Sequence, residues 1–467
     1  MLMQEREDEK MGKKELKLAF IGAGSGFCPR TVDDILLDER LKDVNIHLYL
    51  MDVLEEAVGY STSYAKEVTK DKDWNLTIVG TTNLEEALEG ANFVLTAIEV
   101  EREYYWSMDY HIPRQYGSNQ IYGENGGPGG MFHFLRNIGP MLEIARTMER
   151  LCPDAWLLNY TNPEAKLVDA IGRLTKIKAV GLCHGIGEGQ HMISQLLEIP
   201  AEDLDVAACG LNHFGWYQKI SHKKTGEDLY PLLRERERIA DWMAEWDGAA
   251  MGRILFRTFG LLPYPVSNHI GEYFRWADGL IASPNMQFFY DPANENPWET
   301  KKIPPLVYFA TDYKERGYFE KIGETRENFM AERFRVNPEL TFSGEYGVPI
   351  ISAITFDVET PLLSVNMLNH GSIPGLPDDM AVELPADVNG GGIHPRQMEP
   401  LPDGITEMIR TQGVIHKLIT EAYIEKSRNK LLQAILIDPT VSSYHSSVAM
   451  INEICERQKE ILPEMHW

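Results

Sequence analysis

Apolar and polar positions follow two different periods along the first half of the chain. Short apolar runs predict strands at 16–25, 45–52, 76–83, 93–100, 155–163 and 177–185, and positions of helical spacing predict helices at 32–41, 55–69, 84–91 and 138–151. Strands that alternate with helices in this way predict a parallel sheet with helices on both faces. The expected fold class is therefore α/β, a Rossmann-like doubly wound sheet.

The stretch GSNQIYGENGGPGGMFHFLRN (117–137) interrupts this rhythm. Its glycines predict a loop, or a backbone that lies against a ligand. From about residue 200 the pattern becomes irregular, with helices expected at 229–258 and 405–434 and mixed segments between them. We expect this part to form a second, α+β lobe that covers the substrate.

Composition and charge exclude several classes of function. A chain of 467 residues suggests two or more lobes. The net charge of −25 argues against nucleic acid or an anionic membrane as a partner. No apolar run is as long as a membrane span, and the charged start MLMQEREDEKMGKKE differs from a signal peptide. Five scattered cysteines indicate reduced thiols, so a cytoplasmic location is expected.

A glycine-rich turn, FIGAGSGF, follows the first predicted strand and precedes a helix, which is the context of a dinucleotide site. Gly22 permits the tight turn. Gly24 and Ser25 lie where the backbone approaches a diphosphate at the start of a helix. The third glycine of the usual pattern is replaced by Phe27, so a plain structural turn is the alternative interpretation.

Two strand ends add to this interpretation. Asp52 ends the second predicted strand, where a carboxylate accepts hydrogen bonds from an adenosine ribose and favours NAD. Thr96, at the end of the fourth strand, is expected to line the nicotinamide side of the crevice. The alternatives are a turn residue for Asp52 and strand core for Thr96.

GLCHGI places Cys183 at the carboxyl end of a strand, and His213 lies thirty positions later in GLNHF. A thiolate and a neutral imidazole are suited to binding a metal. A nucleophilic pair and two buried structural residues are alternatives that the residues alone leave open. His184 is not easily a base for Cys183, because adjacent strand residues point to opposite faces. Asn162 of TNPE ends the neighbouring strand and is suited to a sugar hydroxyl or the cofactor.

A set of motifs in order from about residue 16 to 430 resembles glycoside hydrolase family 4. They are FIGAGS, GPGG followed by FLRN, NYTNPE, GLCHG, GLNHF, HIGEYF and VNMLNHGSIPGLPDDMAVELP. The resemblance implies a fold like that of lactate and malate dehydrogenases. It also implies hydrolysis with NAD⁺ and a divalent metal, usually Mn²⁺, in place of a pair of carboxylates.

The resemblance implies a redox-assisted reaction. NAD⁺ takes hydride from the sugar C3, a base removes the C2 proton, and the C1–O bond breaks by elimination before water adds and the ketone is reduced. It further implies that Cys183 and His213 are the metal ligands and that Asn162 binds the substrate.

A tyrosine is implied as the base. Tyr273 of HIGEYF is the candidate and Tyr264 the alternative, because a nearby metal would lower the pKa of a tyrosine. His269 and Glu272 flank Tyr273 and are expected to orient the substrate or metal-bound water. A half-buried structural aromatic is the other interpretation of Tyr273.

The residue after the metal cysteine tracks the substrate in this family, and members that act on phosphoglycosides carry Asp or Asn there. His184 followed by glycine resembles members that act on non-phosphorylated α-glycosides, particularly galacturonides and glucuronides. A C6 carboxylate requires a cationic or hydrogen-bonding partner, for which Arg275, Arg136 and His184 are candidates. His184 also joins Tyr273 as a candidate catalytic residue.

These assignments give an expected organisation and function. A disordered tail at 1–15 precedes an NAD-binding domain at 16–200 and a C-terminal α+β domain at 201–467 that carries catalysis and oligomer contacts. The expected activity is that of an α-galacturonidase or α-glucuronidase in a homodimer or homotetramer. An α-glucosidase or α-galactosidase of the same family, an NAD-dependent sugar or hydroxy-acid dehydrogenase, and a non-catalytic NAD-binding protein are the alternatives.

Overall fold

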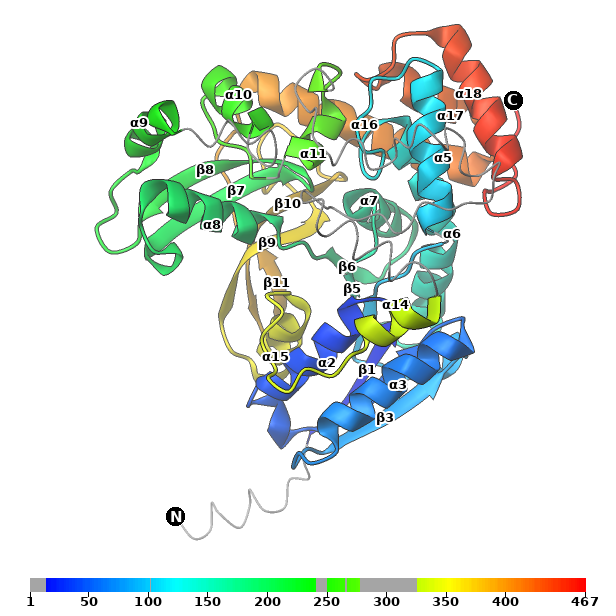
Figure 1. Cartoon of the computed structure of the whole chain (residues 1–467), viewed down its shortest axis with the longest axis vertical. Coiled ribbons are helices and arrows are strands. Elements are labelled where there is room, and N and C mark those ends of the chain that lie inside the picture. Colours follow the sequence, from blue (N-terminus) through cyan, green and yellow to red (C-terminus); the bar gives the residue numbers. More distant parts are fainter. Residues whose placement is uncertain (1–13, 101, 241–249, 265–266, 278–325) are drawn as a thin grey trace.

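The computed structural model describes residues 14–100, 102–240, 250–264, 267–277 and 326–467. Within these residues eleven strands form one sheet in the order β3-β2-β1-β4-β5-β6-β9-β10-β7-β8, with β11 paired to β10 (Figure 1). The strands are β1 (Glu15–Ile21), β2 (Asn45–Met51), β3 (Leu76–Thr81), β4 (Phe93–Thr96), β5 (Trp156–Asn159), β6 (Lys178–Gly181), β7 (Leu204–Leu211), β8 (Phe214–His222), β9 (Thr360–Leu368), β10 (Ala381–Asn389) and β11 (Gly392–Pro395). Most of the predicted tail at 1–15 lies outside the described residues, but β1 already begins at Glu15.

The first six strands form the parallel half of the sheet. Each pairs in parallel with its neighbour in the order β3-β2-β1-β4-β5-β6. Along β1, Leu18 and Phe20 face one apolar cluster while Ala19 and Ile21 face another, so both faces of the strand are buried. Burial on both faces explains the continuous apolar runs in the sequence. The predicted Rossmann-like, doubly wound α/β fold is confirmed.

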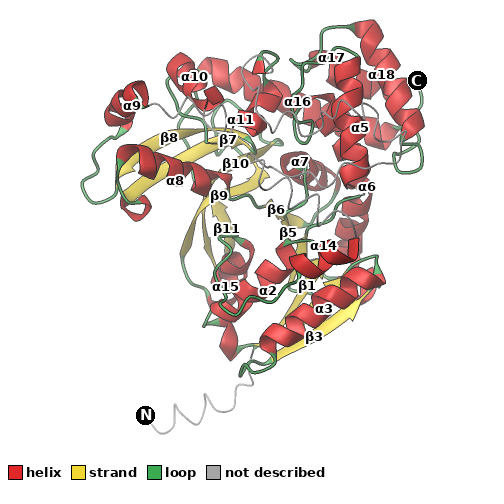
Figure 2. Ribbon diagram, viewed as in Figure 1, coloured by secondary structure: helices red, strands yellow, loops and turns green. Residues whose placement is uncertain are grey.

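Helices cover both faces of this parallel half, as Figure 2 shows. One face packs against α2, α3 and α15, and the other against α4, α6 and α7. The helices before residue 200 are α2 (Phe27–Leu37), α3 (Glu55–Thr69), α4 (Leu84–Leu88), α5 (Arg102–Gln115), α6 (Gly127–Leu151), α7 (Glu164–Leu174) and α8 (Gly185–Leu197). Those after it are α9 (Tyr230–Ile239), α10 (Ala250–Phe259), α11 (Ser267–Ile270), α14 (Arg326–Arg333), α15 (Gly347–Phe356), α16 (Asp403–Glu425), α17 (Arg428–Ile437) and α18 (Tyr444–Arg457).

The glycine-rich stretch 117–137 corrects one expectation. The sequence predicts a loop up to residue 137, but α6 begins at Gly127 and includes the GPGG motif. A Cβ at Gly129 would stand 2.6 Å from the carbonyl oxygen of Asp109, and a Cβ at Gly130 would overlap the carbonyl of Asn125. These glycines therefore allow the helix to pack closely against neighbouring backbone, and they do not break it.

Each of the two long helices expected in the second half is interrupted. The helix expected at 405–434 is divided into α16 and α17 at Lys426, which adopts a left-handed conformation, and at Ser427, whose side chain caps α17. The helix expected at 229–258 is represented by α9 and α10, with residues 241–249 outside the described part.

The antiparallel half continues the same sheet. β9 joins β6 through the pair Gly181 and Asn366, and β10 joins β7 through Glu383 and Gly210. The sheet therefore crosses the domain boundary predicted between residues 200 and 201. Its antiparallel strands and surrounding helices agree with the expected α+β region. None of the helices in the described part of the chain is long and apolar enough to cross a membrane.

Arg136 of α6 belongs to a buried polar cluster with Asp109 and Gln458. Its Nη2 lies 2.8 Å from Asp109 Oδ2, and neither side chain has exposed surface. Its Nη1 donates to Gln458 Oε1 at 3.2 Å, and Gln458 Nε2 donates to Asp109 Oδ1 at 2.8 Å. This placement argues against the predicted contact between Arg136 and a substrate carboxylate, because the guanidinium already neutralises a buried carboxylate.

We expect Arg136→Ala to lower the free energy of unfolding by about 3–5 kcal/mol, because Asp109 would be left as an unpaired buried charge. Urea unfolding followed by circular dichroism measures the loss. Arg150→Ala on the same helix is the control. Its exposed pair with Glu85 predicts a change below about 1 kcal/mol. If Arg136→Ala leaves the free energy of unfolding unchanged and raises the KM for a uronide, Arg136 binds the substrate after all.

Candidate functional site

The turn between β1 and α2 brings Asp52 onto the glycine backbone. Gly22 has a φ of +88°, and a Cβ there would overlap the carbonyl of Ala97. The N–H of Gly24 donates to Asp52 Oδ2 at 2.9 Å, and a Cβ at Gly24 would stand 2.8 Å from Ala57 Cβ. The turn thus depends on glycine at both positions, and the predicted ribose-binding carboxylate lies beside it.

Ser25 and Arg333 add polar groups to the same turn. The Ser25 Oγ is buried without a hydrogen-bond partner among the described residues. Arg333 of α14 donates from Nη1 to the Gly24 carbonyl at 2.6 Å. A hydroxyl and a guanidinium at the start of α2 fit the diphosphate of a dinucleotide. Sequence reasoning did not find Arg333, because it lies far along the chain from the turn.

Thr96 is engaged inside the protein. It is fully buried, and its hydroxyl donates to Asn159 Oδ1 on the adjacent strand β5 at 2.9 Å. This bond argues against the predicted contact between Thr96 and the nicotinamide. The neighbouring Ile98 is half-buried, and its N–H donates to the Thr161 hydroxyl at 3.0 Å.

Cys183 and His213 meet at the carboxyl ends of the parallel strands. Cys183 lies between β6 and α8, and His213 is the second residue of the two-residue turn between β7 and β8. Their Sγ and Nε2 atoms are 3.8 Å apart. Metal bonds of about 2.3 Å to sulfur and about 2.1 Å to nitrogen, in a tetrahedral arrangement, separate two ligand atoms by about 3.6 Å. The pair therefore fits a shared cation.

Glu124 and His269 lie beside His213. Ligand atoms of Glu124, His213 and His269 all lie within 4.8 Å of one another, and the two imidazole rings stack with centroids 4.1 Å apart. A carboxylate is a ligand that manganese prefers. Sequence reasoning missed Glu124, although a lone acid inside the glycine-rich GENGG is the signal that could have identified it.

Glu272 holds the loop that carries Glu124. Its Oε2 accepts the N–H groups of Glu124 at 3.2 Å, of Asn125 at 2.7 Å and of Gly126. The amide of Asn125 in turn lies 3.1 Å from His213 Nδ1. Glu272 thus fixes the backbone beneath Glu124. Its predicted role in orienting substrate or water stays a prediction.

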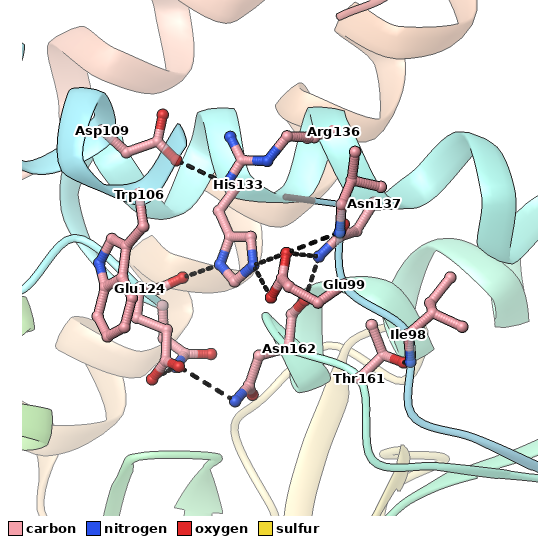
Figure 3. Close-up of polar contacts among 12 residues, drawn as sticks. Ile98, Glu99, Trp106, Asp109, Glu124, His133, Arg136, Asn137, Thr161 and Asn162 are labelled. Atoms are coloured by element: carbon pink, nitrogen blue, oxygen red, sulfur yellow. Dashed lines mark hydrogen bonds and ion pairs between the residues drawn. The ribbon is translucent and has the colours of Figure 1, made fainter. Parts of the chain in front are cut away.

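A chain of polar contacts leads from the end of β4 to Glu124, as Figure 3 shows. His133 bridges Glu99 and Glu124. Its Nε2 lies 2.9 Å from Glu99 Oε2, and its Nδ1 lies 2.9 Å from the backbone carbonyl oxygen of Glu124. Asn137 donates to Glu99 Oε1 at 3.1 Å and to the Asn162 carbonyl at 2.8 Å. The Asn162 amide donates to Glu124 Oε1 at 3.4 Å. The predicted substrate residue Asn162 therefore lies beside the ligand group.

Burial favours the neutral forms of Cys183 and His213. Burial raises the pKa of the Cys183 thiol well above its usual value, and the nearby Glu383 and Glu164 raise it further. Burial lowers the pKa of His213 well below its usual value. A histidine binds a metal in its neutral form, so the lowered pKa of His213 suits a ligand. A bound divalent cation would stabilise the thiolate of Cys183 against the effect of burial.

Both predicted tyrosines are buried and hydrogen-bonded. Tyr273 is buried, stacks on Phe214 with centroids 4.5 Å apart, and donates its hydroxyl to the Asn212 carbonyl at 3.3 Å. The Tyr264 hydroxyl accepts the N–H of His213 at 2.9 Å and bonds the carboxylate of Glu383. Burial raises the pKa of both phenols well above the usual value, so a role as base would depend on a bound cation and stays a prediction.

His184 lies between two carboxylates. Its Nδ1 is 3.0 Å from Glu345 Oε1, and its Nε2 is 3.3 Å from Glu188 Oε1. These hydrogen bonds, first that of Glu188 and then that of Glu345, raise the pKa of His184 to about 10, so it is a cation at neutral pH. Arg275, another of the three predicted partners of a C6 carboxylate, is exposed, and the Asn119 amide donates to its backbone carbonyl at 3.2 Å.

Known proteins resemble the chain over nearly its full length. The family models "Family 4 glycosyl hydrolase" and "Family 4 glycosyl hydrolase C-terminal domain" match residues 17–199 and 208–441. An α-glucosidase of Erwinia rhapontici is 30% identical, over 95% of this chain and 98% of the relative. An α-galacturonidase of Thermoanaerobacter italicus is 28% identical, over 96% and 97%. A 6-phospho-α-glucosidase from gut microorganisms, solved in complex with NAD and Mn²⁺, has a TM-score of 0.77 at 23% identity, over 97% and 100%.

These matches confirm the family that the sequence motifs indicate. The two family models follow each other along the chain, and the relatives are covered almost completely. The solved structure supports the same fold. The chain is a glycosidase that belongs to glycoside hydrolase family 4.

Proposed function

We propose that the chain hydrolyses non-phosphorylated α-glycosides with NAD⁺ and Mn²⁺ as cofactors, and that α-galacturonides or α-glucuronides are its substrates. The observation that carries the proposal is the 3.8 Å separation of Cys183 and His213 beside Glu124. The resemblance to an α-galacturonidase and to a solved complex with NAD and Mn²⁺ supports it. A homo-oligomer and a cytoplasmic location stay predictions.

The dinucleotide would be held at the glycine turn. The hydroxyl of Ser25, which has no partner among the described residues, and the guanidinium of Arg333 would bind its diphosphate where Gly24 leaves room for it, and Asp52 would bind its adenosine ribose. A carboxylate at this position favours NAD⁺, because it repels the additional phosphate of NADP⁺.

The cation would be held by Cys183 and His213, with the carboxylate of Glu124 as an oxygen ligand. When bound, the nicotinamide supplies reversible hydride transfer and the cation supplies stabilisation of negative charge on sugar oxygens. Asn162 lies beside Glu124, so its amide would orient a sugar hydroxyl toward this group.

The choice of sugar depends on His184. A protonated imidazole attracts a C6 carboxylate, which would replace the exposed Glu188 at Nε2 while Glu345 keeps Nδ1, and this supports the uronide proposal. A second candidate is an α-glucosidase or α-galactosidase activity on neutral hexosides. The two carboxylates of Glu188 and Glu345 favour it, because together they outweigh the charge of the single imidazolium. The 30% identical α-glucosidase supports this second candidate.

We expect hydrolysis of an aryl α-galacturonide to fall at least about 100-fold when the enzyme is stripped of metal by a chelator or of NAD⁺, because loss of one residue that supports a metal ligand already costs about 10- to 100-fold. Adding NAD⁺ and Mn²⁺ together should restore the rate and should exchange solvent deuterium into the sugar C2. Hydrolysis that is unchanged without both cofactors contradicts the proposal. Net accumulation of NADH during turnover would favour a dehydrogenase.

We expect His184→Gln to lower kcat/KM for an aryl α-uronide by about 10- to 100-fold, the equivalent of a charge-assisted hydrogen bond of about 1.5–3 kcal/mol. The matching neutral α-galactoside and α-glucoside should change far less, and Arg275→Gln is the control for loss of an exposed cation. Initial rates on the aryl α-galacturonide, α-glucuronide, α-galactoside and α-glucoside measure the difference. Equal losses on all four, or a wild-type preference for a neutral sugar, would support the second candidate.

A further inference from the structure

We infer that Tyr264 is a positioning residue that fixes the distance between Cys183 and His213, an inference that rests on the proposed metal-dependent function. Tyr264 follows α10, outside the strands and helices that carry the two ligands. It is buried, and its hydroxyl and its ring contact the segments of both ligands. It acts through the ligands, and so it differs from the catalytic base that the sequence proposes.

The hydroxyl of Tyr264 stabilises the turn that carries His213. His213 has a φ of +63°, a conformation that is unfavourable for a residue with a Cβ. The Tyr264 hydroxyl accepts the His213 N–H at 2.9 Å and donates to Glu383 of β10. Asn212, the other turn residue, donates its amide to Glu383 Oε2 at 3.4 Å. Both residues of the turn are therefore tied to the same buried carboxylate.

The ring of Tyr264 lies between the two ligand segments. A Cβ at Gly215 would overlap Tyr264 Cε1, and a Cβ at Gly185 would stand 3.2 Å from Cε2, on the opposite edge of the ring. The Tyr264 N–H also donates to the Gly215 carbonyl at 3.2 Å. Each of these glycines stands two positions after a ligand, in GLCHG and in GLNHFG. The width of the ring thus sets how far apart the two ligand backbones lie.

Hydroxyl and ring together hold the Cys183 Sγ and His213 Nε2 atoms 3.8 Å apart. Removing only the hydroxyl leaves the ring between the glycines but removes the acceptor for the His213 N–H. The strained turn is then free to relax, and the imidazole loses its fixed direction toward Cys183. Metal affinity decreases as a result, because ligand orientation depends on such supporting bonds.

The test is Mn²⁺ binding to the full-length protein without substrate, measured by calorimetry or by the electron paramagnetic resonance of free Mn²⁺. We expect Tyr264→Phe to raise the Kd for Mn²⁺ by at least about tenfold. With Co²⁺ as the probe, the thiolate charge-transfer absorption that reports Cys183 coordination should weaken. Tyr230→Phe is the matched control, because Tyr230 is buried in the same apolar cluster and donates its hydroxyl to the Tyr217 carbonyl. It should change thermal stability and leave the Kd unchanged.

The outcomes separate the two proposals. A wild-type protein that binds no Mn²⁺ overturns the proposed function. A wild-type protein that binds Mn²⁺, with an unchanged Kd in Tyr264→Phe, overturns the positioning role alone. Where Tyr264→Phe does not fold, Glu383→Gln replaces it, because it weakens the acceptor of the Tyr264 hydroxyl without changing side-chain size. An unchanged Kd in Glu383→Gln likewise overturns the inference.

Discussion

The join between the parallel and antiparallel halves of the sheet decides where the site residues lie. β9 pairs with β6 at Asn366 and Gly181, and β10 pairs with β7 at Glu383 and Gly210. These short pairings bring the end of β6 and the β7–β8 turn together. Residues thirty positions apart in the sequence then face each other at 3.8 Å, on the edge where α/β sheets bind ligands.

The join is polar and buried, which is costly unless its groups are bonded to each other. Glu164 accepts from the Asn366 amide at 2.9 Å, and burial raises the pKa of Glu164 well above its usual value. Burial also raises the pKa of Glu383 to about 7, although its hydrogen bonds with Tyr264 and Asn212 oppose the shift. The network favours one arrangement of the ligands, because displacing a member would leave further buried polar groups unpaired, in addition to the oxygens of Glu164 and Glu383 that already lack a partner among the described residues.

Sequence pattern and structure agree best for features that depend on residues close together in the chain. The strand ends near Asp52 and Cys183 follow from apolar runs and glycine signals, and the structure places both at the expected edge of the sheet. The helix at Gly127 was missed because glycine disfavours helices in isolation. Here it allows backbone to approach backbone, a contact that only the folded chain reveals. Arg136 illustrates the same limit, because its partner Asp109 lies on another helix.

The sequence by itself determined the family, the doubly wound sheet, the glycine turn with its carboxylate and the pair Cys183 and His213, because each depends on residues close in the chain or on motifs in order. Only the tertiary structure decided which other groups join them. Glu124 enters from a glycine-rich loop, and Arg333 reaches the turn from the second half. The phenol of Tyr264 links the His213 backbone to Glu383. Such contacts depend on how distant segments pack, and no local pattern of residues encodes them.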